Sequence, residues 1–207
     1  HEGNIPPNQQ QHIRRHSGRI GARLRFLSVQ HLFDEYATCQ QTQSTNPLCG
    51  SFDARLDHFS CGYRAMCHFW FVAVDQYLPG YEYLLRIDED CVLAGPQSDP
   101  YTTADLASPS WQGMDARFVT LGMERFFGQL AGELRLHWPE HGTWRSPYTN
   151  VMWISSDFLR RTRHLRERVA DTACIRDNRW GDLPLWGAMV TLLRAEHHVL
   201  RLSYHHG

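Results

Sequence analysis

Two acidic residues, Asp88 and Asp90, follow an apolar and aromatic segment at 81–87 whose composition is typical of a buried strand. Side chains alternate along an extended backbone, so Asp88 and Asp90 are expected to share one face while Glu89 points away. Carboxylate oxygens bind hard divalent cations, and ligands of open α/β sheets gather at the carboxyl ends of strands. The pattern predicts a site where Mg²⁺ or Mn²⁺ clamps a diphosphate, with an ordinary turn or helix cap as the alternative.

Other residues with suitable chemistry stand at the ends of other predicted elements. Asp182 precedes an apolar helix at 185–193, where we expect it either to cap the helix or to orient a sugar hydroxyl. Trp180 offers an aromatic face that can stack on a sugar. His206 follows a predicted strand at 198–204 and can supply a metal ligand, although most histidines are ordinary surface or core residues and this chain has 13.

Hydrophobic periodicity and turn residues divide the chain into helices and strands. A helix at 6–16 is followed by a strand at 24–29, which is the order found in α/β domains, and 207 residues suffice for one substantial core. We therefore predict a single α/β domain over residues 1–207, with its first strand upstream of residue 1. The arginine-rich segment at 160–168 is expected to form a solvated helix face. The expected helices are 6–16, 61–78, 118–138, 155–169 and 185–193, and the expected strands are 24–29, 81–87, 111–113, 150–154 and 198–204.

The composition of the chain argues against several classes of protein. A formal net charge of −1, from 21 basic and 22 acidic residues, argues against a nucleic-acid or membrane-surface binder. No apolar run approaches the ~20 residues that span a bilayer. All basic residues are arginines, and the absence of lysine excludes Schiff-base chemistry. The chain begins without an initiator methionine and reads there like the loop after a strand, so we expect a fragment.

Six cysteines leave both the secretory and the cytosolic compartments open. Cys39 and Cys49 flank a polar loop that a disulfide between them would close. No Cys-x-x-Cys pair is present, which argues against a zinc site, and buried free thiols are the alternative to disulfides.

Four motifs follow one another along the chain. They are Gly62-Tyr63-Arg64-Ala65-Met66-Cys67-His68-Phe69, then Tyr81-Glu82-Tyr83 through Arg86-Ile87-Asp88-Glu89-Asp90, then Asn178-Arg179-Trp180-Gly181-Asp182-Leu183-Pro184, and finally Ser203-Tyr204-His205-His206. Over about residues 62–207 this order resembles the fungal α-1,2-mannosyltransferase family. The resemblance implies a GT-A-type fold with a central mixed sheet flanked by helices. It also implies a retaining glycosyltransferase that uses Mn²⁺ (or Mg²⁺) and GDP-mannose to modify a carbohydrate hydroxyl. Its location would be the Golgi lumen for a fungal protein and the cytoplasm for a bacterial one.

The same resemblance implies roles for individual residues. The family's acid-Pro-Asp motif falls on residues 88–90 and its metal-binding histidine on His206. The expected metal ligands are therefore Asp88, Asp90 and His206. Arg86 is expected near the phosphates, although it could equally pair with an acid inside the sheet. The other expected site residues are Arg64 and Asp90 at the donor phosphates, Asp182 and Asn150 in catalysis, and Trp180 and Tyr148 at the acceptor.

The chain departs from the family at one chemically important position. Where the family has a glutamate regarded as a possible nucleophile, this sequence has Met152, which can neither attack an anomeric carbon nor stabilise positive charge. Same-face attack by the acceptor is then easier to reconcile with retention than double displacement. A different donor sugar is another interpretation, and a non-catalytic carbohydrate- or nucleotide-binding module is a further alternative. A metal-dependent phosphoesterase is less well supported because such sites recruit more clustered ligands.

Overall fold

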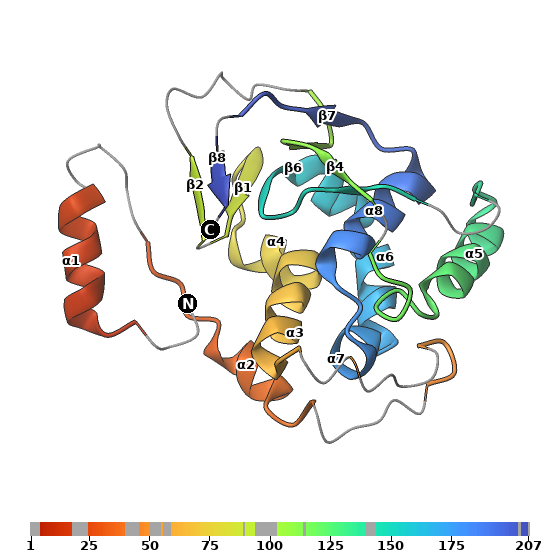
Figure 1. The fold of residues 1–207 in the computed structure, drawn as a ribbon, viewed down its shortest axis with the longest axis horizontal. Helices are drawn as coiled ribbons and strands as arrows, with labels where there is room; N and C mark the ends of the chain where they lie inside the picture. The colour runs from red at the N-terminus through yellow and green to blue at the C-terminus, as the bar shows by residue number, and fades with distance from the viewer. Residues whose placement is uncertain are drawn as a thin grey trace.

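The computed structural model describes residues 5–17, 25–39, 46–49, 55, 59–88, 90–93, 103–113, 115–139, 144–202 and 204–206. At its centre is a four-stranded sheet in the order β1-β6-β3-β7 (Figure 1). β6 runs antiparallel to both β1 and β3, whereas β3 and β7 are parallel. The predicted central mixed sheet is therefore confirmed. The strands are β1 (Tyr83–Ile87), β3 (Leu106–Ser108), β6 (Val151–Ser155) and β7 (His197–Val199).

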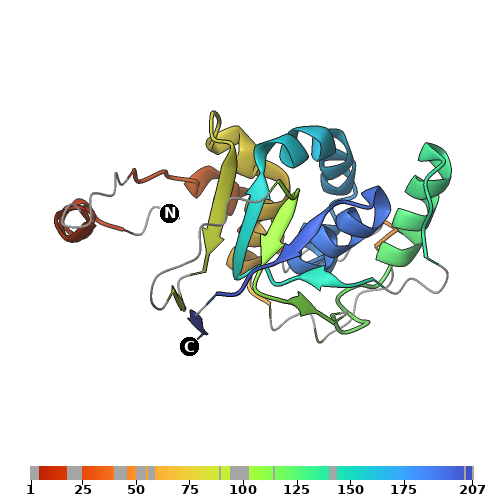
Figure 2. The same ribbon diagram turned by 90° about the horizontal axis from the view of Figure 1, so that it is seen from above.

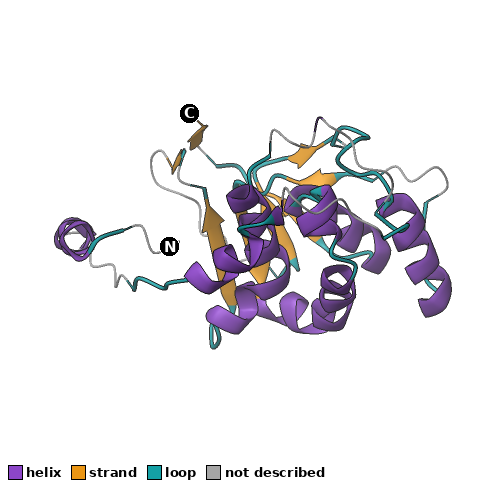
Figure 3. Cartoon of the chain, turned by 90° about the horizontal axis from the view of Figure 1, so that it is seen from below, coloured by secondary structure: helices purple, strands orange, loops and turns teal. Residues whose placement is uncertain are grey.

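Helices cover one face of this sheet, as Figure 3 shows from below. The sheet side chains on that face are Leu84, Leu106, Met152 and Ile154, and they join the apolar side chains of the helices in the main core. α8 is apolar on nearly all sides because it is buried on nearly all sides. The helical elements around this core are α3 (Cys61–His68), the π-helical turn η4 (Phe69–Ala73), α4 (Val74–Tyr77), α6 (Ser156–Asp171) and α8 (Asp182–Leu193).

The opposite face of the sheet carries a smaller cluster. Ala107, Val151 and Trp153 point to this side, and Leu200 and Leu202 from the C-terminal segment pack against the cluster they form. Two short two-stranded ribbons lie beyond the sheet, and Figure 2 shows the C-terminal one from above. They are β2 (Cys91–Leu93) with β8 (Tyr204–His206), and β4 (Trp111–Gln112) with β5 (Ser146–Pro147).

Two disulfides join segments that are distant in the sequence. The predicted Cys39–Cys49 bridge is wrong, because Cys39 pairs with Cys61 and Cys49 pairs with Cys174. The second bridge spans 125 residues of sequence and connects the start of α7 to a distant segment. Cys67 and Cys91 are buried free thiols. The other helices are α1 (Pro7–Ser17), α2 (Gln30–Tyr36), α5 (Met123–Leu134) and α7 (Cys174–Asn178).

Several predicted boundaries move for local reasons. Within the predicted strand at 24–29, residues 25–29 form neither helix nor strand. The helix predicted at 118–138 begins only at Met123, after Gly122 at φ 86°, and Arg135 at φ 57° follows its last residue. The strand predicted at 198–204 is divided between β7 and β8. No helix in the described part of the chain has the length and apolar character needed to cross a membrane.

The sequence predicted a solvated face for the arginine-rich helix α6, and this prediction is wrong for one of its arginines. Arg166 is fully buried, and its guanidinium donates to the carbonyl oxygens of Phe71 (3.0 Å), Val72 (2.7 Å) and Leu159 (2.7 Å). A π-helical turn shifts the regular backbone pairing, so its carbonyls need other donors. Arg166 supplies them and joins α6 to η4.

Candidate active site

The acidic segment after β1 forms a tight turn. The backbone N–H of Asp88 donates to the carbonyl oxygen of Asn150 (2.8 Å), and that of Cys91 donates to the carbonyl oxygen of Asp88 (3.0 Å). The extended backbone therefore ends at Ile87, so the argument from strand alternation does not apply to Asp88 and Asp90, and their shared face stays a prediction. The turn alternative describes the backbone correctly. Asp90 is exposed, whereas the side chain of Asp88 is 23% exposed.

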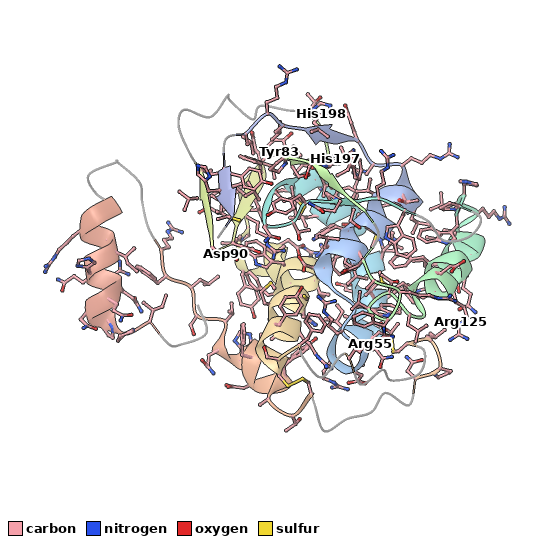
Figure 4. All side chains as sticks on the ribbon, viewed as in Figure 1. Arg55, Tyr83, Asp90, Arg125, His197 and His198 are labelled. Carbon is pink, nitrogen blue, oxygen red and sulfur yellow. A yellow bond between two sulfur atoms is a disulfide. The ribbon has the colours of Figure 1, made fainter. Side chains whose placement is uncertain are left out.

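The turn leads directly into a strand that pairs with the end of the chain. β2 and β8 are antiparallel, with Cys91 opposite His206, and they lie side by side in Figure 1. Asp90 lies beside this ribbon in Figure 4. Since Asp90 immediately precedes Cys91, the pairing brings the backbone of His206 next to the acidic turn across more than 110 residues of sequence. This backbone pairing is consistent with the convergence that the resemblance implied, and a shared cation stays a prediction.

Arg86 stands at the centre of a buried charge cluster. It is 2% exposed because it lies on the helix-covered face of β1, together with Leu84. Its Nε and Nη2 donate to the two carboxylate oxygens of Asp88, at 2.7 Å and 3.1 Å. Its Nη1 donates to the carboxylate of Asp182. Burial alone would lower the pKa of Arg86, but Asp182 and Asp88 outweigh it and raise that pKa. Arg86 thus pairs with acids, as the alternative expected, but these acids lie in the turn after β1 and at the start of α8 rather than inside the sheet.

Asp182 and Trp180 are both enclosed by protein. Asp182 is 2% exposed and is the first residue of α8, while Gly181 occupies the N-cap position, so the predicted cap is wrong. The thiol of Cys67 donates to Asp182 Oδ1 at 3.3 Å. Trp180 is fully buried, and its indole N–H donates to the carbonyl oxygen of Leu121 at 2.9 Å. The assigned roles of Asp182 in catalysis and of Trp180 at the acceptor stay predictions, and neither side chain reaches solvent here.

Arg64 lies elsewhere in the core. It is 1% exposed, and its Nη1 donates to the carbonyl oxygens of Arg176 (2.6 Å) and Asp177 (3.2 Å), which fastens α3 to α7. The structure therefore does not bring Arg64 to the acidic turn through these contacts. Its phosphate role stays a prediction.

Asn150 and Tyr148 lie closer to the acidic turn. Asn150 accepts the hydrogen bond from the backbone of Asp88 and immediately precedes β6. Tyr148 belongs to the cluster on the open face of the sheet, with its ring centroid 5.5 Å from that of Tyr204 in β8. Burial raises the pKa of the Tyr148 hydroxyl. Both residues thus flank the region where β1, β2 and β8 meet.

Three further residues around Arg86 were not predicted as part of the site. The sulfur of Met66 lies 3.5 Å from Arg86 Nη2, and the Trp70 ring centroid lies 5.2 Å from the guanidinium carbon. Both come from the helical segment that covers β1, and Cys67 on the same segment contacts Asp182. The sequence predicted a helix for this segment and no role in the site for its aromatic and sulfur side chains. The sequence pattern that could have identified this segment as part of the site is the Met66-Cys67 pair inside the motif at 62–69.

The acidic turn has the chemistry for a divalent cation but is incomplete as a ligand set. Among the side chains that the structure describes, no three His, Cys, Asp or Glu residues form a group that could hold a metal ion. Asp88 and Asp182 nevertheless place two carboxylates on one guanidinium, so this cluster keeps a net negative charge. Asp88 is its more exposed member, and each of its oxygens has a second lone pair beyond the bond to Arg86. Burial raises the pKa of Asp88, and Arg86 opposes that rise. Asp88 fits a role as a cation ligand.

No protein-family model and no curated protein matches this chain. The solved mannosyltransferase Ktr4p from S. cerevisiae in complex with GDP is similar in structure, with a TM-score of 0.59 and 15% identity over 85% of this chain and 50% of that one. A second structure of Ktr4p gives a TM-score of 0.57, 14% identity and the same coverage of both chains. Core-mannan synthase A (CmsA/Ktr4) from Aspergillus fumigatus, in its Mn/GDP form, gives 0.55 and 16% over 85% and 54%. The chain thus has the fold of about half of these proteins, which confirms the expected resemblance at the level of fold.

Proposed function

We propose that this protein is a metal-dependent glycosyltransferase that moves a sugar from a nucleoside-diphosphate sugar to a hydroxyl group of a carbohydrate acceptor. The observation that carries the proposal is the β2–β8 pairing, which sets the backbone of His206 beside the acidic turn at the end of β1. The similar solved structures include a GDP complex and an Mn/GDP form. They support a purine nucleoside diphosphate as the leaving group, and GDP-mannose with Mn²⁺ as the first donor and metal to test.

Asp88, Asp90 and His206 are the residues that we propose hold the cation. Carboxylate oxygens and imidazole are both ligands of Mn²⁺. A bound divalent cation supplies neutralisation of the negative charge on the departing diphosphate. Asp88 is held in one orientation by its two hydrogen bonds from Arg86, so its free lone pairs point in a fixed direction before any ligand arrives.

Donor and acceptor contacts are proposed from the residues around the turn. Asn150 is next to β6 and is bonded through its backbone to Asp88, which favours a contact to the donor sugar. Tyr148 flanks β8 and is proposed at the acceptor. Trp180 and Arg64 would need to become exposed before they could touch a ligand, so the proposal does not depend on them.

Retention of configuration is proposed without a nucleophile at residue 152. Met152 is fully buried within β6 and carries no charge. Attack of the acceptor on the same face as the departing diphosphate requires no enzyme carboxylate beneath the sugar. The structure of the product, determined by NMR of the new glycosidic bond, tests this part of the proposal.

The experiment is a transfer assay with the 207-residue chain, Mn²⁺ and a panel of GDP- and UDP-sugars, with simple mannosides and glucosides as acceptors. We expect release of nucleoside diphosphate and a new glycoside with one donor, and loss of both when EDTA is added. Asp88→Asn and His206→Ala should reduce the rate at least about a hundredfold, since each removes a ligand of the cation. Asp171→Asn, which changes an exposed acid at the end of α6, is the matched control and should leave the rate unchanged.

A second candidate function is a nucleotide- or carbohydrate-binding module without catalysis, which the buried Met152 favours. Calorimetry with GDP and Mn²⁺ distinguishes the two. Binding of GDP with Mn²⁺ but no product after long incubation, with every donor in the panel, would support the module. A chain that shows no binding and no turnover would overturn both proposals.

A further inference from the structure

We infer that Asp182 is a positioning residue: its carboxylate holds Arg86, and Arg86 in turn orients Asp88 toward the cation. This inference rests on the proposed function, but it gives Asp182 a different task from the acceptor-side role expected from the sequence. In that role Asp182 would touch or deprotonate a hydroxyl group of the acceptor. In the role inferred here it contacts no substrate.

The carboxylate of Asp182 is surrounded by buried protein groups. Its side chain is 3% exposed, with Oδ2 bonded to Arg86 and Oδ1 accepting from the Cys67 thiol at 3.3 Å. Both oxygens are thus engaged by buried protein donors. A general base must reach the proton that it removes, directly or through one water. Asp182 is enclosed by α3 and β1 instead, because it opens the buried helix α8.

The guanidinium of Arg86 connects Asp182 to Asp88. It spans the two acids, with Nη1 on Asp182 and with Nε and Nη2 on Asp88. Met66 and Trp70 close its remaining sides. A planar guanidinium bonded on both edges cannot rotate without breaking several hydrogen bonds. The orientation of the Asp88 carboxylate is therefore coupled to Asp182.

β6 supplies no carboxylate to Arg86, because Met152 occupies the position opposite it. The two residues are paired in the β1–β6 ladder, and residues so paired in antiparallel strands project to the same face. An acidic residue at position 152 would lie beside the guanidinium. With methionine there, the carboxylate that meets the inner edge of Arg86 comes from α8, a different element.

The net charge of the cluster favours binding of a cation at Asp88. Asp88, Arg86 and Asp182 together carry one net negative charge, which is most accessible at Asp88. Removing the charge of Asp182 would leave Asp88 neutralised by Arg86 and would free one edge of the guanidinium. Both effects disfavour a cation at Asp88. Partners of ligating carboxylates typically change metal affinity by about 10- to 100-fold when mutated.

The test is Asp182→Asn, with the affinity for Mn²⁺ and GDP measured by calorimetry and the transfer kinetics measured at saturating Mn²⁺. We expect Mn²⁺ affinity to fall at least about tenfold and to be the main defect, with the KM of the acceptor unchanged. Normal Mn²⁺ and GDP binding combined with loss of transfer, or a raised acceptor KM alone, would overturn the inference and favour the acceptor-side role.

Two further variants keep the test decisive if Asp182→Asn unfolds. The double variant Arg86→Gln/Asp182→Asn removes the two buried charges together and retains neutral hydrogen-bonding groups, and it should also lose Mn²⁺ affinity. Asp177→Asn is the matched control, because Asp177 is a buried acid with its own partner, Arg176, away from the turn. It should bind Mn²⁺ and GDP like the wild type. A wild-type chain that binds neither Mn²⁺ nor GDP would refute the proposed function itself, which separates that failure from a failure of the inference.

Discussion

Met152 lies directly opposite Arg86 between β6 and β1, and both side chains are buried on the face of the sheet that the helices cover. The resemblance places a glutamate at residue 152, so the pairing defines what that glutamate would meet in this chain. It would meet a guanidinium that already holds Asp88 and Asp182. A glutamate at residue 152 would thus be a third carboxylate around one buried guanidinium.

Met152→Glu should destabilise the protein rather than supply a nucleophile. A third carboxylate beside one buried guanidinium lacks a counter-ion, and an unpaired buried charge costs about 3 kcal/mol or more of the free energy of unfolding. Urea unfolding of the variant measures this loss. Met152→Leu, which nearly conserves volume, should cost less than about 1.5 kcal/mol. An unchanged free energy of unfolding or an increased transfer rate in Met152→Glu would contradict this account.

Arg166→Met should also reduce stability strongly. The substitution removes the donors of the η4 carbonyls at Phe71 and Val72 and leaves Asp75, whose side chain is 11% exposed, without its buried partner. Loss of one member of such a buried network costs about 3–5 kcal/mol, which chemical denaturation can measure.

Arg160→Met on the same helix is the control for Arg166. Its side chain is 72% exposed, and its pair with Asp157 is an ordinary i,i+3 surface contact worth less than about 1 kcal/mol. If both variants lost the same amount of stability, the buried contacts of Arg166 would not be the cause.

Two glycines in or next to α5 should respond in opposite directions to alanine. Gly122 precedes the helix at φ 86°, and an added Cβ would lie 2.0 Å from the carbonyl oxygen of Leu48. Gly122→Ala therefore meets both backbone strain and a clash with another segment, and we expect a loss of at least about 2 kcal/mol. Gly132 lies inside the helix with open space around it, so Gly132→Ala should stabilise by about 0.5–1 kcal/mol. Melting temperatures that moved in the same direction would refute this assignment.

The sequence predicted what local periodicity controls. The helical segment at 61–78, the strands before Asp88 and after Asn150, and the α/β class follow from apolar spacing and turn residues, whereas the GT-A-type fold followed from the resemblance. The expectation that the strand before Asp88 is buried is wrong, because β1 is an edge strand with Leu85 and Ile87 exposed. The convergence of the acidic turn with His206 followed from the resemblance and is consistent with the backbone pairing of Cys91 and His206. Patterns along the chain are thus sufficient to place the elements around the site.

The missed features depend on contacts between distant segments. Arg166 looks like any other arginine of its helix, and its burial is decided by the π-helical turn that it meets. Disulfide partners cannot be deduced from the spacing of cysteines. Cys49 pairs with Cys174, which is 125 residues away, and not with the nearer Cys39. Asp182 looks like a helix cap until its distance to Arg86 is known.

His197 should make the protein less stable in mild acid. Its Nε2 lies 2.8 Å from the hydroxyl oxygen of Ser108, its ring centroid is 4.0 Å from that of Trp111, and its buried Nδ1 has no hydrogen-bond partner among the described residues. Burial, aided by the neighbouring His198, lowers the pKa of His197 to about 4. The unfolded chain takes up a proton near pH 6.5, whereas the folded protein does not until about pH 4.

The stability that His197 contributes is therefore present above about pH 6.5 and is lost as the pH falls toward 4. Because the ring is partly exposed, we expect a loss of about 1–2 kcal/mol rather than the full value of the pKa shift. Urea unfolding at pH 7 and pH 4.5 measures it. His197→Gln keeps a donor toward Ser108 but cannot titrate, so its stability should fall less than that of the wild type over this range. His198→Gln changes a more exposed histidine on the same strand and removes only the smaller cause of the lowered pKa, so it should reduce the pH dependence less than His197→Gln does. Equal pH dependence of wild type and His197→Gln would rule out His197 as the source.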